Sequence, residues 1–223
     1  KKYILSLVLE KKVPQAIIEI KRNIGKTNTD FFDSYLLLIL DSLKKDDFEQ
    51  AYSYLSYAAN FAKQDRLNLV ILDNLKKFIF VFKEKKILDG NKKFDKLSFI
   101  SETFQRCYLG DPKTDVYFSN LTNDNEADYS RYIYFYLSYL IESNRINDAK
   151  QITKDIVFIN TTLLLSQGKI WIENENFKKL IKVFSCKNHN DIVSEFLFLI
   201  SNLYSTQGNF EKSNFYLNLS NFL

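Results

Sequence analysis

The residues best suited to metal or nucleophilic chemistry in this chain are one histidine and two cysteines. His189 follows Cys186 by three positions, a spacing that can bring two metal ligands together. A structural zinc site takes four protein ligands, and a catalytic one takes three ligands and water. The sequence has no Cys-x-x-Cys pair and no further histidine to complete such a set. We therefore predict neither a metal site nor a catalytic Cys-His pair here, and we favour a turn between helices.

Paired carboxylates occur at Asp46-Asp47 and at Glu173 and Glu175. Both pairs fall at predicted turns, where acidic side chains cap a helix and favour its positive end. The chain also lacks a glycine-rich phosphate loop, a G-x-S-x-G elbow and an H-E-x-x-H helix. We predict no catalytic residue and no cofactor, so the chain is not expected to be an enzyme. The alternative is a helical-repeat enzyme whose site is assembled from distant segments.

The net charge of +4 is concentrated between Asp73 and Lys96, where eight lysines stand against four acids. A nucleic-acid-binding helical repeat could use these lysines to follow phosphates. Arginine is absent from this window and acids interrupt it, so a solvated loop is favoured. Nucleic acid remains an alternative partner, as does an acidic protein or a membrane surface. The lysines concerned are Lys76, Lys77, Lys83, Lys85, Lys86, Lys92 and Lys93.

Amphipathic helices joined by short turns recur along the chain, most clearly between Ser194 and Leu223. Gly208 can take the left-handed backbone that ends one helix there, and Asn209 can cap the next. The apolar residue after each such turn is Val13, Phe48, Ile146, Phe177 or Phe210, at steps of 35, 98, 31 and 33 residues. Three positions further on lie Ala16, Ala51, Ala149, Leu180 and Ser213, which are mostly small, as close helix crossings require.

This pattern resembles the tetratricopeptide repeat family, in which helix-turn-helix units of about 34 residues carry small or aromatic residues at fixed offsets. The resemblance covers roughly residues 3–60 and 129–223. The last unit matches at Leu197, Ile200, Ser201, Tyr204, Gly208, Phe210, Ser213, Leu217 and Ser220; the unit before it at Leu164, Gly168, Trp171, Phe177 and Phe184; and an early unit at Tyr35, Leu38, Phe48, Ala51, Leu55 and Ala58.

The expected fold is all-α, a right-handed superhelical solenoid of stacked antiparallel hairpins that occupies residues 1–223 as one domain. Only Pro14, Pro112 and five glycines interrupt the helical pattern, and 46% of the residues are hydrophobic. We expect residues 62–128 to contain two degenerate repeats with a longer loop. Methionine is absent and the chain starts at Lys1, so we expect a piece of a longer repeat array.

The resemblance implies a non-catalytic protein-protein interaction or scaffolding module, whose concave groove holds a peptide or helix of a protein partner. The family's groove-facing offsets fall on Arg131, Tyr134, Ser138, Lys169, Glu173, Asn202 and Ser205. The identity of the partner and the oligomeric state stay open.

No charge-free stretch is long enough to span a bilayer, and the compartment stays open, with the cytoplasm as the working expectation. Cys107 and Cys186 lie in different predicted hairpins, and nothing in their spacing predicts a disulfide.

Overall fold

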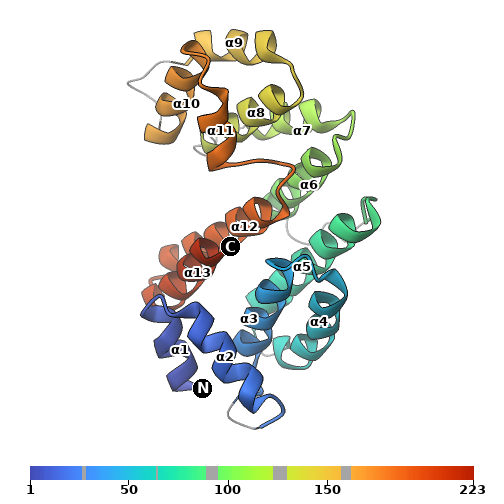
Figure 1. Ribbon diagram of the computed structural model, residues 1–223, viewed down its shortest axis with the longest axis vertical. Helices are drawn as coiled ribbons and strands as arrows, with labels where there is room; N and C mark the ends of the chain where they lie inside the picture. The colour runs from blue at the N-terminus through green and yellow to red at the C-terminus, as the bar shows by residue number, and fades with distance from the viewer. Residues whose placement is uncertain (27–28, 64, 89–94, 123–129, 157–161) are drawn as a thin grey trace. The chain divides into compact units, whose positions relative to one another are not determined.

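The computed structural model describes residues 1–26, 29–63, 65–88, 95–122, 130–156 and 162–223. Every helix or strand assigned among these residues is an α-helix (Figure 1), which confirms the all-α prediction. The helices are α1 Lys2–Leu9, α2 Val13–Asn23, α3 Phe32–Leu43, α4 Phe48–Ala62, α5 Arg66–Glu84, α6 Asp95–Leu109, α7 Thr114–Thr122, α8 Ser130–Glu142, α9 Ile146–Lys154, α10 Leu163–Glu173, α11 Phe177–Val183, α12 His189–Thr206 and α13 Phe210–Phe222.

The helices group into two compact units instead of the single predicted array. Unit 1 contains Lys1–Phe94 and Val193–Leu223, and unit 2 contains Asp95–Ile192. In chain order, unit 2 is therefore an insertion between two parts of unit 1. Helix α12 contributes its first residues to unit 2 and the remainder to unit 1.

One turn geometry ends six of the helices. In each turn a residue with φ between 57° and 74° bonds through its N–H to the carbonyl three residues earlier. The N–H of the next residue bonds to the carbonyl five residues earlier, at 2.7–3.0 Å. This is the Schellman ending of a helix, which satisfies carbonyls that would otherwise lack donors. The left-handed residues are Lys11, Asp46, Gly110, Asn144, Glu175 and Gly208.

The predicted markers are confirmed as helix starts, because Val13, Phe48, Ile146, Phe177 and Phe210 are the first residues of α2, α4, α9, α11 and α13. Asn209 caps α13 by accepting from the backbone N–H of Lys212, as predicted. The mostly small residues three positions after each of these helix starts also lie where helices cross. Ala16, Ala51, Ala149 and Leu180 have no exposed surface, and Ser201 Oγ donates to the Ser213 carbonyl at 2.8 Å.

Among the described residues in the middle of the chain, α6 and α7 form one hairpin, and a second was expected between residues 62 and 128. The turn at Gly110 joins α6 to α7, and it lies about two repeat steps after the turn at Asp46. Between them α5 continues for 19 residues and ends at Lys85, which is left-handed. Helix α5 thus takes the place of a second hairpin, and the sequence around residues 89–94 and 123–129, where a longer loop was expected, lies outside the described residues.

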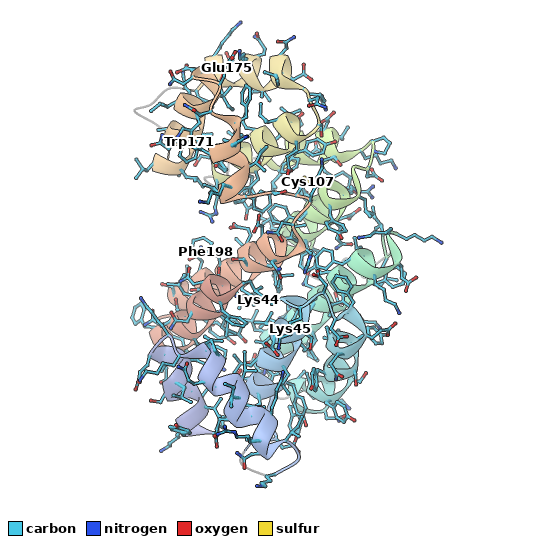
Figure 2. The ribbon with its side chains drawn as sticks, in the orientation of Figure 1. Lys44, Lys45, Cys107, Trp171, Glu175 and Phe198 are labelled. Carbon is cyan, nitrogen blue, oxygen red and sulfur yellow. A yellow bond between two sulfur atoms is a disulfide. The ribbon has the colours of Figure 1, made fainter. Side chains whose placement is uncertain are left out.

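Unit 1 closes on itself, since α13 packs against α1 and α2. Asn218 Nδ2 donates to the Val8 carbonyl at 2.9 Å, and Lys212 Nζ lies 3.0 Å from a carboxylate oxygen of Asp33. Lys44, at the end of α3 in Figure 2, has its ammonium 4.2 Å from the ring centre of Phe222. In an open solenoid each hairpin contacts only its neighbours in sequence, so unit 1 differs from the predicted serial stack.

Helix α8 is the centre of unit 2 and packs against α7, α9, α10 and α11. Its Tyr134 hydroxyl donates to the Leu180 carbonyl at 2.9 Å. The ring of Tyr134 also covers Gly168 of α10, where a Cβ atom would come within 2.7 Å of the ring. Gly168 is therefore required by this close approach of α8 and α10.

Candidate functional site: a groove between α4 and α5

Two of the seven residues predicted to line a groove are buried instead. Tyr134 and Ser138 have no exposed surface, and the Ser138 hydroxyl donates to the Phe184 carbonyl at 2.6 Å. Both side chains hold α8 against α11 and its following segment, so neither lines an accessible surface. The prediction is wrong for these two because offsets taken from an open array do not apply to a helix that is surrounded by its neighbours.

The other five predicted residues do not form one surface. Arg131 places its guanidinium 5.2 Å from the ring centre of Phe135, and Lys169 Nζ donates to the Ile156 carbonyl at 2.8 Å. Glu173 is in unit 2 and half exposed. Asn202 and Ser205 are exposed on α12 in unit 1. Their roles in binding stay predictions.

The lysine-rich stretch does not present a continuous track of available cations. Lys77 is buried beside Asp73, with a nitrogen-oxygen distance of 2.6 Å. Lys83 pairs with Glu49 at 2.6 Å and with Glu84 at 3.4 Å. Lys92 and Lys93 lie outside the described residues. These ion pairs weaken the nucleic-acid alternative, which requires lysines that can exchange counterions for phosphates.

An open groove lies between α4 and α5 of unit 1. These helices pack as an antiparallel pair, because Phe48 at the start of α4 lies against Phe82 near the end of α5. The groove has an apolar floor formed by Leu55 and Leu72, which are almost completely buried. The lining residues are Tyr52, Leu55, Ser56 and Ala59 from α4, and Leu72, Asp73 and Lys76 from α5.

The α4 side of this groove is free of charge over an unusual length. From Gln50 to Ala62 no residue is charged, although 26% of the chain is. This stretch still faces solvent, with Tyr52 45% and Tyr57 54% exposed, and Ser56 and Ala59 are exposed between them. Exposed aromatic residues and a lack of charged ones are typical of the centre of a protein interface. On the other flank of α4, Tyr57 stacks on Tyr35 with ring centres 5.6 Å apart, which fixes its position.

The charges around the groove are mainly positive. Lys63 ends α4 and Arg66 begins α5, so both lie at one end of the groove, and Lys76 lines it further along. All three are exposed, and none has an ion-pair partner among the residues that the structure describes. Asp73, the acid in the lining, is paired with Lys77. A ligand in the groove would therefore meet cations whose charge is not balanced by the protein.

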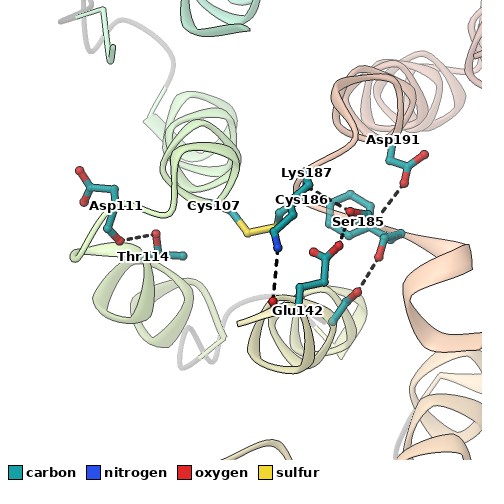
Figure 3. Close-up of a disulfide and its surroundings, with 10 residues drawn as sticks. Cys107, Asp111, Thr114, Glu142, Ser185, Cys186, Lys187 and Asp191 are labelled. Carbon is teal, nitrogen blue, oxygen red and sulfur yellow. Dashed lines mark hydrogen bonds between the residues drawn. A yellow bond between two sulfur atoms is a disulfide. The ribbon is translucent and has the colours of Figure 1, made fainter. Parts of the chain in front are cut away.

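A second notable feature is the disulfide between Cys107 and Cys186 in unit 2 (Figure 3), which the sequence did not predict. It joins α6, the first helix of the unit, to the segment between α11 and α12. The two residues are 79 positions apart, and their Cα atoms are 5.5 Å apart. Because Cys186 is bonded to Cys107, it is not available as a ligand with His189. Closing a loop of this length stabilises a fold by about 4.5 kcal/mol in the chain-entropy treatment.

Ser185 connects two carboxylates beside this disulfide. Its hydroxyl lies 2.5 Å from Glu142 Oε1, and its backbone N–H donates to Asp191 Oδ2 at 2.8 Å (Figure 3). Burial raises the pKa of Asp191 above its ordinary value, and the nearby charge of Glu142 raises it further, against the bond from Ser185 and the charge of His189, which lower it. These two hydrogen bonds hold the Cys186 segment in place.

The described part of the chain holds no set of three histidine, cysteine, aspartate or glutamate side chains placed to bind a metal ion. Of the helices described, none combines the length and the apolar character needed to cross a membrane. The α4–α5 groove combines a buried apolar floor with exposed, uncharged side chains of α4. Its signal is present in the sequence as the charge-free run from Gln50 to Ala62, which is independent of the repeat spacing.

Comparison with known proteins gives no relative: no protein-family model matches the chain, and neither a curated protein nor a solved structure matches it. The likeness to tetratricopeptide repeats therefore stays a prediction that rests on the turns and their spacing.

Proposed function

We propose that this chain is a non-catalytic protein-interaction module built from tetratricopeptide-like helical hairpins, and that it binds an acidic amphipathic helix of a partner protein in the α4–α5 groove. The recurrent Schellman turns at spacings close to the family's repeat length support the hairpin part of this proposal. The observation that carries the binding part is the exposed, charge-free face of α4 beside an apolar floor.

The groove suits a helix better than an extended strand. A strand ligand gains affinity by adding to the open edge of a sheet, and the described residues of this chain form no sheet. Two antiparallel helices leave a furrow into which the side chains of a third helix can pack. Leu55 and Leu72 form its floor, while Tyr52 stands exposed in its lining. A partner helix would place apolar residues at positions i, i+3, i+4 and i+7 on this floor.

The charge of the partner follows from the unpaired cations. Lys63, Arg66 and Lys76 would attract acidic side chains along the flanks of the bound helix, and a basic helix would be repelled. Surface charges of this kind contribute more to orientation and association rate than to affinity. The apolar floor would supply the affinity.

A labelled synthetic peptide tests the proposal directly. The probe is an amphipathic helix of about 18 residues with leucine at i, i+3, i+4 and i+7 and glutamate on both flanks, a length sufficient for partial helicity in water. Its binding to the full chain is followed by fluorescence anisotropy. We expect saturable binding, weakened about tenfold or more by Ser56→Arg, which fills the groove, and by Lys76→Glu, which reverses the charge on its wall.

Two controls make the result specific. Ser53→Arg adds the same side chain to the exposed surface of α4 outside the groove lining, and it should leave the affinity unchanged. A peptide with lysine in place of every glutamate should not bind. Equal loss with Ser53→Arg and Ser56→Arg, or equal binding of the acidic and basic peptides, would contradict the proposal.

A further inference from the structure

We infer that the Cys107–Cys186 disulfide is a permanent structural bond, formed by oxidation before unit 2 closes, and that the protein accordingly works in an oxidising compartment. This inference concerns unit 2 and does not depend on the groove of unit 1. It replaces the working expectation of a cytoplasmic location, which was made when no disulfide was predicted.

The position of the bond indicates a structural role. Unit 2 runs from Asp95 to Ile192, and the disulfide connects residues close to its two ends. In chain order it therefore fastens together the places where the chain enters and leaves the inserted unit. Both cysteines of the chain are used, and no free thiol remains. A cross-link of this span removes many unfolded conformations, so it favours the closed unit.

The burial of the sulfur-bearing residues excludes easy exchange in the folded protein. Cys107 is 3% exposed and Cys186 is 1% exposed. Thiol-disulfide exchange requires a thiolate to reach one of the two sulfur atoms. The segment that carries Cys186 is also held by its neighbours, since Ser185 bonds to Glu142 and Asp191, and Lys187 Nζ donates to the Glu142 carbonyl at 3.3 Å. A reductant therefore has no path to the bond without opening unit 2.

The same burial determines when the bond forms. Two protein thiols lose two protons and two electrons as the sulfur-sulfur bond is made, and an acceptor disulfide of the thiol-disulfide oxidoreductase class takes up the electrons and becomes a dithiol. The first thiolate attacks the acceptor and gives a mixed disulfide, and the second protein thiolate then displaces the acceptor. An oxidoreductase cannot reach two buried sulfurs, so this exchange must precede closure. Cytosolic thiol pools hold such cysteines reduced, whereas exported proteins are oxidised as they fold.

The experiment starts from full-length protein in the cell that produces it. Cells are lysed directly into denaturant with N-ethylmaleimide, and the alkylated cysteines are counted by mass spectrometry with and without prior reduction. We expect no alkylation of Cys107 and Cys186 without reduction, and alkylation of both after reduction. Alkylation of both without reduction would overturn the inference, because it would show that the protein is a dithiol where it works.

Purified protein tests permanence separately. Under native conditions dithiothreitol should leave the disulfide intact over hours, and addition of urea to the midpoint of unit 2 unfolding should accelerate reduction by about a hundredfold or more. Rapid reduction without denaturant would contradict a buried structural bond. The double variant Cys107→Ser with Cys186→Ser should melt about 15–35 °C lower than the oxidised chain. If that variant fails to fold, the comparison of reduction rates still decides the question.

Discussion

Unit 1 and unit 2 both bring distant segments together, and they do so by different means. Unit 1 joins the two ends of the chain through the packing of α13 on α1 and through polar contacts such as Asn218 to Val8. Unit 2 joins its two ends through a covalent bond between Cys107 and Cys186.

The cores explain the difference. Every residue of α3 in unit 1 is buried, so that helix provides apolar contact on all sides. In unit 2 the central helix α8 still has half-buried residues on its surface, and it relies on hydroxyl groups that bond to backbone carbonyls. A unit with less apolar burial gains more from a cross-link, as small domains in oxidising compartments generally do.

Among the non-covalent contacts, the largest effect is expected from breaking the closure of unit 1. In the Lys212→Met variant the Asp33 carboxylate, which is 5% exposed, loses its ion-pair partner. We expect a loss of about 2 kcal/mol, less than the roughly 3–5 kcal/mol for a fully buried pair, because the Lys212 side chain is itself partly exposed. The single tryptophan, Trp171, lies on α10 in unit 2 (Figure 2), so its fluorescence follows unit 2, while circular dichroism follows both units.

Urea unfolding should therefore show a weakened transition by circular dichroism and an unchanged transition by Trp171 fluorescence. Adding Asp33→Asn to Lys212→Met should recover part of the loss, because the unpaired charge is then removed. An equal shift of both transitions would mean that the two units unfold together. That result would contradict the separate closure of unit 1 and unit 2.

A smaller effect is expected in unit 2 from Gly168→Ala. Alanine favours a helix over glycine by up to about 1 kcal/mol, but its Cβ atom would lie 2.7 Å from the Tyr134 ring. That ring is fixed at its hydroxyl by the Leu180 carbonyl, so relief requires α8 and α10 to move apart. Overpacking of this kind costs about 1–3 kcal/mol, and we expect a net loss of about 1 kcal/mol in the Trp171 transition.

The neighbouring substitution Gln167→Ala on α10 serves as the control and should change stability by less than about 0.5 kcal/mol. Combining Gly168→Ala with Tyr134→Leu should cost less than the sum of the two single changes, because the ring that clashes is gone. Additive losses would show that α8 and α10 do not approach as closely as described.

The smallest effect is a pH dependence carried by Asp191. Its pKa is raised in the folded protein, so the folded state holds this proton at a pH where the unfolded chain has released it. At neutral pH the buried Asp191 carboxylate is ionised, and this lowers the free energy of unfolding of unit 2. That free energy should rise as the pH falls through the raised pKa of Asp191 toward the ordinary value of 3.8. Asp191→Asn removes the charge and keeps an oxygen that can accept from Ser185 N–H.

The measurement is the difference in Trp171 unfolding free energy between wild type and Asp191→Asn across this pH range. We expect the variant to be the more stable at neutral pH and the difference to shrink on acidification. A difference that grows as the pH falls would mean that the Asp191 carboxylate is stabilised in the folded state, contrary to its burial.

The repeats could be predicted where an apolar residue directly follows the turn. At Gly110 the same turn is present, but Pro112 occupies the marker position and α7 starts only at Thr114, so the spacing did not identify it. Four of the six left-handed residues are not glycine, which means that composition alone does not identify the turn either. The groove between α4 and α5 could have been predicted from the absence of charge in α4. The burial of Tyr134 and Ser138 could not have been predicted, because it depends on where α11 lies.

Helical periodicity and Schellman hydrogen bonds join residues no more than five positions apart, so the helices and most of their turns could be predicted from the sequence. The fold was needed to show that α5 takes the place of a hairpin, that α13 returns to α1 and that Cys107 meets Cys186. The last two contacts join residues 79 to 210 positions apart. An apolar stripe shows that a helix must be covered, and it does not name the helix that covers it, because burial of apolar surface is non-directional.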